Sequence, residues 1–176
     1  MIPSMRKLAS FLLPLLLLSM APAQNRRDPL NSREIDQLRD AAQDPDQRLK
    51  LFIEFARARL AAIEQMRADP KVTDRAQQTH DRLQDFLDVY DELNDNVDAF
   101  VDLKADLRKA LKGVIEADTE FQAKLRALKA SVESSKEETK QYDFLLSNAL
   151  DAVDSGVQDH RQLLSEQEEA AKRKKK

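Results

Sequence analysis

The sequence predicts an all-α protein: an antiparallel helical bundle or coiled coil built around one long heptad-patterned helix, after a cleaved signal peptide. Three observations lead to this prediction. Charged residues make up 35% of the chain, which holds only two glycines and no cysteine, a composition typical of long helices with solvated outer faces. Apolar residues recur at spacings of three and four. The N-terminus carries a short apolar run.

The N-terminal 23 residues have the three parts of a secretory signal. Residues 6–7 are basic, residues 8–20 are an apolar run and residues 21–23 are small, so we expect cleavage after Ala23. The run is shorter than the ~20 apolar residues that a spanning helix needs. The prediction is an exported protein, periplasmic or extracellular, with no transmembrane segment in the mature chain.

An extended leader over residues 24–30 precedes a helical domain over residues 31–171. Asn31 and Glu34 have capping-box spacing, which predicts a first helix over 32–43. The Asp44-Pro45 pair then starts a second helix over 45–68, since aspartate caps well and proline suits the first helical turn. The apolar positions of that helix recur along one face: Leu49, Phe52, Ile53, Ala56, Leu60 and Ile63.

A heptad seam follows, and it predicts one continuous helix over residues 73–132. Every seam position but two is apolar, and such a helix would be about 90 Å long at ~1.5 Å per residue. The turn-prone residues 94–96 and Gly113 are the two weak points. A break near Asn96 would give a compact four-helix bundle instead. The seam is Phe86, Tyr90, Leu93, Val97, Phe100, Lys104, Leu107, Leu111, Val114, Asp118, Phe121, Leu125, Leu128 and Val132.

The last helix is expected over residues 136–171, with a second capping box formed by Ser135 and Glu138. We expect it to fold back against the second half of the long helix, and the helix over 45–68 to lie along the first half. Residues 81–106 hold nine acids, whereas the earlier helix has an excess of bases. Opposite charges on neighbouring flanks favour this pairing.

Lys104 and Asp118 are the two polar interruptions of the seam. A polar seam residue can fix helix register or oligomeric state at some cost in stability. Alternatively, each side chain reaches out to solvent while apolar neighbours fill the seam. Both interpretations are structural.

No metal or cofactor site is predicted. Metal-binding four-helix bundles place a glutamate three residues before a histidine, but Gln77 precedes His80 and Val157 precedes His160 at that spacing. Both histidines lie on or beside apolar stripes, so we expect partly buried structural residues. An acidic heptad face is interpreted as solvated and as pairing with the helix over 45–68; its members are Asp81, Asp88, Asp95 and Asp102.

The chain ends in a basic tail over residues 172–176. Its charges complement a helix C-terminus, and they are also candidates for weak contact with an anionic surface such as lipid headgroups. A solvated tail is the alternative. Nucleic acid is not an expected partner, because the body of the chain, residues 24–171, holds 22 bases against 32 acids. The tail residues are Lys172, Arg173, Lys174, Lys175 and Lys176.

The sequence argues against an enzyme. With glycine only at 113 and 156, phosphate-cradling loops and nucleophile elbows cannot form. The leading hypothesis is a non-enzymatic envelope protein that acts through helical surfaces, as a scaffold, by self-association or by holding another envelope protein. This plan is similar, in architecture alone, to periplasmic holdase chaperones and envelope spacer proteins. The alternative is a compact sensor that binds a small ligand or metal between helices, with Lys104, Asp118 and the histidines as candidate contacts.

Overall fold

The computed structural model describes residues 28–132 and 136–174, and these residues form helices joined by short links, with no strand among them. The prediction of an all-α helical bundle is confirmed for this part of the chain. The elements are α1 (Ser32–Asp40), α2 (Pro45–Ala68), α3 (Arg75–Asp102), α4 (Arg108–Val132), α5 (Lys136–Thr139) and α6 (Asp143–Lys174).

Local capping starts the first two helices, as the sequence predicts. In α1 the Asn31 side chain accepts the Glu34 N–H at 3.0 Å, and the Glu34 carboxylate accepts the Asn31 N–H at 2.9 Å. In α2 the Asp44 carboxylate accepts the Gln47 N–H at 3.0 Å, and Pro45 occupies the first turn. These bonds satisfy backbone donors that have no partner within the helix.

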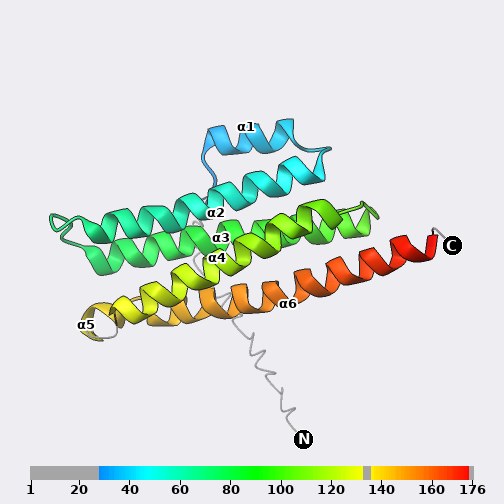
Figure 1. Ribbon diagram of the computed structural model, residues 1–176. Coiled ribbons are helices and arrows are strands. Elements are labelled where there is room, and N and C mark those ends of the chain that lie inside the picture. The colour runs from blue at the N-terminus through cyan, green and yellow to red at the C-terminus, as the bar shows by residue number, and fades with distance from the viewer. Residues whose placement is uncertain (1–27, 133–135, 175–176) are drawn as a thin grey trace, which may run out of the picture.

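Four long helices, α2, α3, α4 and α6, lie side by side as a bundle, and α1 lies along the outer side of α2 (Figure 1). The most extensive packing joins α2 to α3 and α4 to α6. The predicted pairings of the second and last helices are therefore confirmed. Packing of α2 on α4 and of α3 on α6 closes the bundle.

One continuous apolar core runs through the bundle. Complete burial of a large apolar side chain stabilises a fold by about 1.5–3 kcal/mol, and this chain has no disulfide to assist. Apolar packing must therefore supply most of the stability. The largest fully buried side chains are Tyr90, Tyr142, Phe52, Phe86 and Phe121.

The prediction of a continuous helix over residues 73–132 is wrong. The chain breaks at residues 103–107, where Lys104 adopts φ 57°. The N–H of Lys104 donates to the Val101 carbonyl at 2.8 Å and that of Ala105 donates to the Phe100 carbonyl at 3.0 Å. This pair of bonds is a Schellman motif, which ends a helix with one residue in the left-handed conformation.

The alternative break site was also misplaced, because residues 94–96 lie inside α3 and Gly113 lies inside α4. The link is held from outside: Gln167 of α6 accepts the Leu107 N–H at 2.8 Å and donates to the Ala105 carbonyl at 3.2 Å. A tertiary contact therefore satisfies backbone groups that a continuous helix would have satisfied itself.

The heptad pattern nevertheless identified the buried face correctly. Every apolar seam residue from Phe86 to Val132 is buried except Leu128, which is partly buried. The seam is shared between two antiparallel helices, α3 and α4. The heptad pattern therefore does not describe the coiled coil of one long, continuous helix. The same periodicity serves a bundle in which α3 and α4 each bury one face.

The outer helix bounds also differ from prediction. The first helix ends at Asp40, and the last predicted helix is divided between α5 and α6, with a turn in which the Tyr142 N–H donates to the Thr139 carbonyl at 3.0 Å. α6 then continues to Lys174. Ser135 of the second predicted capping box lies outside the described residues.

The charges of α2 are used only in part as predicted. Asp85 of α3 attracts Arg59 of α2, but the acidic face is not wholly solvated, because Asp88 is buried. Three arginines of α2 form ion pairs with carboxylates outside the acidic stretch 81–106. The ion pairs are Arg57–Glu120 at 2.8 Å, Arg59–Glu34 at 2.7 Å and Arg67–Glu138 at 2.5 Å.

The predicted signal peptide and most of the leader lie outside the described residues. Among the helices that the structure does describe, none has a stretch long and apolar enough to cross a bilayer.

Candidate functional site

A buried polar network crosses the core at Asp118. The Asp118 side chain has no solvent exposure. Its Oδ1 accepts a hydrogen bond from the Tyr90 hydroxyl at 2.9 Å, and its Oδ2 lies 2.8 Å from Nδ1 of His160. Tyr90 is fully buried and His160 is 4% exposed. Helices α3, α4 and α6 therefore each contribute one member.

Packing around the network fixes the Tyr90 ring. Phe121 meets Phe86 and Tyr90 edge-on, with ring centroids 5.5 Å and 6.3 Å apart. On the α6 side, Gly156 leaves room for the phenol, because a Cβ there would overlap the Tyr90 hydroxyl oxygen and lie 3.2 Å from Cζ. The glycine is therefore required by the close approach of Tyr90 to α6.

The network also fixes where protons lie. A carboxylate can only accept, so the Tyr90 hydroxyl and the Nδ1–H of His160 both donate to Asp118. Burial, together with the negative charge of Asp118, raises the pKa of the Tyr90 phenol and keeps it protonated. In a neutral imidazole whose Nδ1 carries the proton, Nε2 is left as a hydrogen-bond acceptor.

A groove of about 410 Å³ lies between α3 and α6 beside this network. Its volume is within the range of small-molecule sites, about 300–1,000 Å³. His160 lines it, and Nε2 of His160 has no hydrogen-bond partner among the described residues. The lining residues are Asn94, Val97, Asp98, Val101, Ala152, Ser155, Gly156, Asp159, His160 and Leu163.

Asn94 is a second polar group of the groove without a complete set of bonds. Its Oδ1 is inaccessible to solvent and accepts no hydrogen bond from the described part of the chain. A buried acceptor without a donor costs about 1–3 kcal/mol. Because this oxygen is inaccessible to solvent, a molecule in the groove does not reach it without a movement of the Asn94 side chain.

The residues singled out from the sequence are distributed unevenly. Asp118 is buried in the seam, as expected, and the structure brings it together with His160. Lys104 is exposed in the α3–α4 link, so it occupies no core position from which to set register. His80 is partly buried and contacts Asp81 at 3.2 Å, far along the chain from the network.

The basic tail is only partly described. Lys172, Arg173 and Lys174 extend the last turn of α6, and Lys172 pairs with Glu169 at 2.8 Å. Lys175 and Lys176 lie outside the described residues. The predicted contact with an anionic surface stays a prediction.

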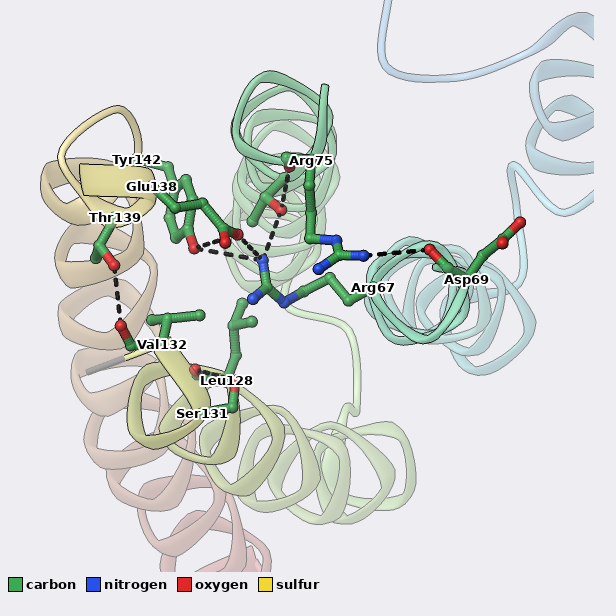
Figure 2. Close-up of polar contacts among 10 residues, drawn as sticks. Arg67, Asp69, Arg75, Leu128, Ser131, Val132, Glu138, Thr139 and Tyr142 are labelled. Atoms are coloured by element: carbon green, nitrogen blue, oxygen red, sulfur yellow. Dashed lines mark hydrogen bonds and ion pairs between the residues drawn. The ribbon is translucent and has the colours of Figure 1, made fainter. Parts of the chain in front are cut away.

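A second polar cluster lies at the end of the bundle where α5 joins α6 (Figure 2). Arg67 donates to Glu138 at 2.5 Å, and the Tyr142 hydroxyl, 3.2 Å from Glu138, lies 3.3 Å from Arg67. Thr139 donates to the Val132 carbonyl at 3.1 Å. These bonds tie α5 to α2 and α4, and we interpret the cluster as structural.

Two other grooves offer weaker cases. A groove of about 270 Å³ between α2 and α4 has an apolar lining, but its two cations are already paired, Arg67 with Glu138 and Lys124 with Glu64. An acidic groove of about 610 Å³ lies along α3 beside Asp28. The described residues contain no group of three or more His, Cys, Asp or Glu side chains placed to hold a metal ion.

Sequence reasoning missed three parts of the groove. Asn94 was interpreted as a turn residue, and Asp98 and Asp159 belong to helix faces that give no signal of a cavity. The one available signal was Gly156, which lies next to the apolar stripe of α6 in the sequence. A glycine inside a helix at such a position indicates close approach of another group.

Comparison with known proteins gives no family assignment: the chain matches no protein-family model, and no similar curated protein or solved structure was found.

Proposed function

We propose that this chain is an exported, non-enzymatic helical bundle that binds a small ligand in the groove between α3 and α6. The observation that carries the proposal is His160. Its Nδ1 is held by the buried Asp118 at 2.8 Å, while the ring lines the groove with Nε2 unpartnered among the described residues.

Energetics support a functional origin for this arrangement. Taking a carboxylate and an imidazole into the core carries a desolvation cost, and well-packed apolar residues in the same place are often as stable or more so. The network orients one ring nitrogen at a groove, as outer-shell partners orient a binding histidine. The competing explanation is that Asp118 only fixes the pairing of α3, α4 and α6.

Catalysis is not favoured by the contacts of His160. In a nucleophile–base pair the nucleophile lies within hydrogen-bond reach of the base. In the described residues, Ser155 of the groove bonds to Asp159 at 3.2 Å instead, and His160 bonds only to Asp118. An Asp–His pair without a nucleophile can still hold a ligand.

The scaffold or holdase hypothesis depended on the continuous helix over 73–132, so the break at residues 103–107 removes its main support. In the part of the chain that the structure describes, two large apolar side chains are strongly exposed, Leu103 and Phe144. Leu103 lies in the α3–α4 link and Phe144 at the start of α6, at opposite ends of the bundle (Figure 1). They do not form one surface for a partner protein.

A thermal-shift screen of the purified protein tests the proposal. The compounds would be amines, dicarboxylates, sugars and divalent metal ions. A ligand at 100 times its Kd stabilises by about 2.7 kcal/mol, which raises Tm by roughly 5–10 °C for a domain of this size. We expect at least one such shift in the wild type.

The groove variant Ala152→Phe should lose that shift, because the new ring would fill the space between α3 and α6. Ala170→Phe, on the exposed end of α6, is the matched control and should retain it. A screen without any shift, or a shift that survives in Ala152→Phe, would contradict the proposal and favour a purely structural network and a role in protein binding.

A further inference from the structure

The polar atoms of the α3–α6 groove are nearly all hydrogen-bond acceptors. Asp98 of α3 and Asp159 of α6 supply carboxylates from opposite walls. The lining includes no lysine or arginine. Only the Ser155 hydroxyl and the Asn94 NH₂ group can donate, and Ser155 already donates to Asp159 at 3.2 Å.

His160 adds a further acceptor to the lining of the groove. Because the Nδ1–H of His160 donates to the Asp118 carboxylate, a ring that carries its proton on Nδ1 presents the lone pair of Nε2. The buried network therefore determines the hydrogen-bonding character of the groove, and it makes His160 complementary to an N–H donor.

The apolar part of the groove limits the ligand further. Val97, Val101 and Leu163 line it with hydrocarbon, and ~25 cal/mol is gained for each Å² of apolar surface removed from water. The surroundings of the groove are also acidic, since α3 holds eight acids between residues 81 and 102. A cation with a short hydrocarbon portion fits both features.

Other cations fit less well. The described residues include no group of three or more metal-capable side chains suited to an ion. Quaternary ammonium ions, which have no N–H, are recognised by aromatic rings, and no Phe, Tyr or Trp lines this groove.

We propose that the ligand is a small protonated alkylamine, whose ammonium N–H groups donate to Asp98, Asp159 and Nε2 of His160 while its carbon chain packs on Val97, Val101 and Leu163. This inference rests on the proposed function, because it names the ligand class of the same groove. A diamine, with one ammonium group for each wall, should bind more tightly than a monoamine.

Isothermal titration calorimetry of the purified protein at low salt would use 1,4-diaminobutane and n-butylamine as probes. 1,4-Butanediol, succinate and tetramethylammonium are the matched neutral, anionic and N–H-free controls. We expect binding of the two amines alone, weakened when salt is raised from 50 to 500 mM because the rim charges are then screened.

Charge variants locate the site. The double variant Asp98→Asn/Asp159→Asn should bind 1,4-diaminobutane at least fivefold more weakly. The control Asp102→Asn/Asp151→Asn removes the same charge from exposed positions of α3 and α6 outside the groove lining and should change the affinity less than twofold. Equal losses in both double variants would mean non-specific attraction and overturn the inference.

A spectroscopic readout on His160 is independent of affinity. In ¹⁵N-detected NMR of the imidazole rings, free His160 should be the Nδ1–H tautomer, and 1,4-diaminobutane should shift its Nε2 resonance while leaving His80 unchanged. An Nε2–H tautomer in the free protein would overturn the inference.

These experiments distinguish a failure of the proposed ligand site from a failure of the amine assignment. Suppose that succinate or butanediol binds, that Ala152→Phe abolishes this binding, and that the amines do not bind. The groove is then a ligand site, and the amine assignment is wrong. If no probe binds and the wider screen gives no shift, both are wrong.

Discussion

The role of Asp118 follows from the structure and not from its place in the sequence. In the sequence it is a polar interruption of an apolar seam, and in the structure it accepts hydrogen bonds from Tyr90 and His160 inside the core. Its burial is tolerated because both carboxylate oxygens are bonded. The two glycines differ in the same way, since both lie within helices but only at Gly156 would an added Cβ overlap a neighbour, the Tyr90 hydroxyl.

The glycines give a matched pair of variants. Gly156→Ala should destabilise the protein by about 1–3 kcal/mol, because overpacking displaces Tyr90 from Asp118. Gly113→Ala should stabilise it by about 0.5–1 kcal/mol, because the added Cβ meets only Ile53 at 4.0 Å and alanine has the higher helix propensity. Urea unfolding measures both free energies. Similar effects of the same sign would mean that Tyr90 does not approach α6 as described.

Removal of the Tyr90 hydroxyl tests the network directly. Tyr90→Phe keeps the ring packed against Phe86 and Phe121 but removes one of the two donors to Asp118. We expect a loss of about 1–3 kcal/mol in the free energy of unfolding, because a buried acceptor loses a partner. A neutral or stabilising effect in urea unfolding would show that Asp118 does not depend on this bond.

At the scale of elements, the ends of helices are fixed by different means. α1 and α2 begin at side-chain caps that adjoin them in the sequence, whereas α3 ends at a lysine in the left-handed conformation supported by Gln167 from α6. α1 itself is held on α2 by Arg59, which donates to both carboxylate oxygens of Glu34 at 2.8 Å and 2.7 Å.

The helix break predicts that two substitutions of Lys104 have opposite effects on the free energy of unfolding. Lys104→Gly should stabilise the protein by about 0.5–1 kcal/mol, because glycine adopts positive φ without steric cost. Lys104→Val should destabilise it by about 1 kcal/mol or more, since a β-branched residue is least tolerated there. In a continuous helix, glycine would instead cost about 1 kcal/mol. Thermal unfolding of the two variants decides between the two structures.

The attachment of α1 should weaken in acid. Burial alone would raise the pKa of Glu34, but the hydrogen bonds from Arg59 and from the Asn31 backbone outweigh it, and the pKa is lowered. A lowered folded-state pKa means that the stabilisation is complete above the ordinary value of about 4.5 and is lost as pH falls below it.

Urea unfolding between pH 7 and pH 3 measures this loss. Glu34→Gln should be less stable than the wild type at pH 7, and its stability should depend less steeply on pH below about 4.5. Parallel curves for the two proteins would show that the Glu34 carboxylate contributes no pH dependence.

At the scale of the whole molecule, the break converts a rod into a bundle. The predicted helix over 73–132 would be about 90 Å long, whereas α3, with 28 residues, is about 42 Å long at ~1.5 Å per residue. Folding α4 back places Asp118 beside Tyr90, 28 positions away in the sequence. The groove between α3 and α6 exists only because of this reversal.

Small-angle X-ray scattering, with the mass checked by light scattering, tests the shape. A compact domain of this length has a radius of gyration near 15 Å, and we expect a monomer below about 20 Å. A value above about 25 Å would require the rod, and the scaffold hypothesis would then replace the groove.

The sequence by itself determined the helical class, the capped starts of α1 and α2, the buried apolar seam and the pairing of α2 with α3 and of α4 with α6. These features depend on periodicity and on side chains that act on neighbours in the chain. The tertiary structure decided where the seam breaks, because no glycine or proline marks residues 103–107 and the support comes from Gln167 of α6. It also decided the site, since Tyr90, Asp118 and His160 belong to three helices and meet only when those helices pack.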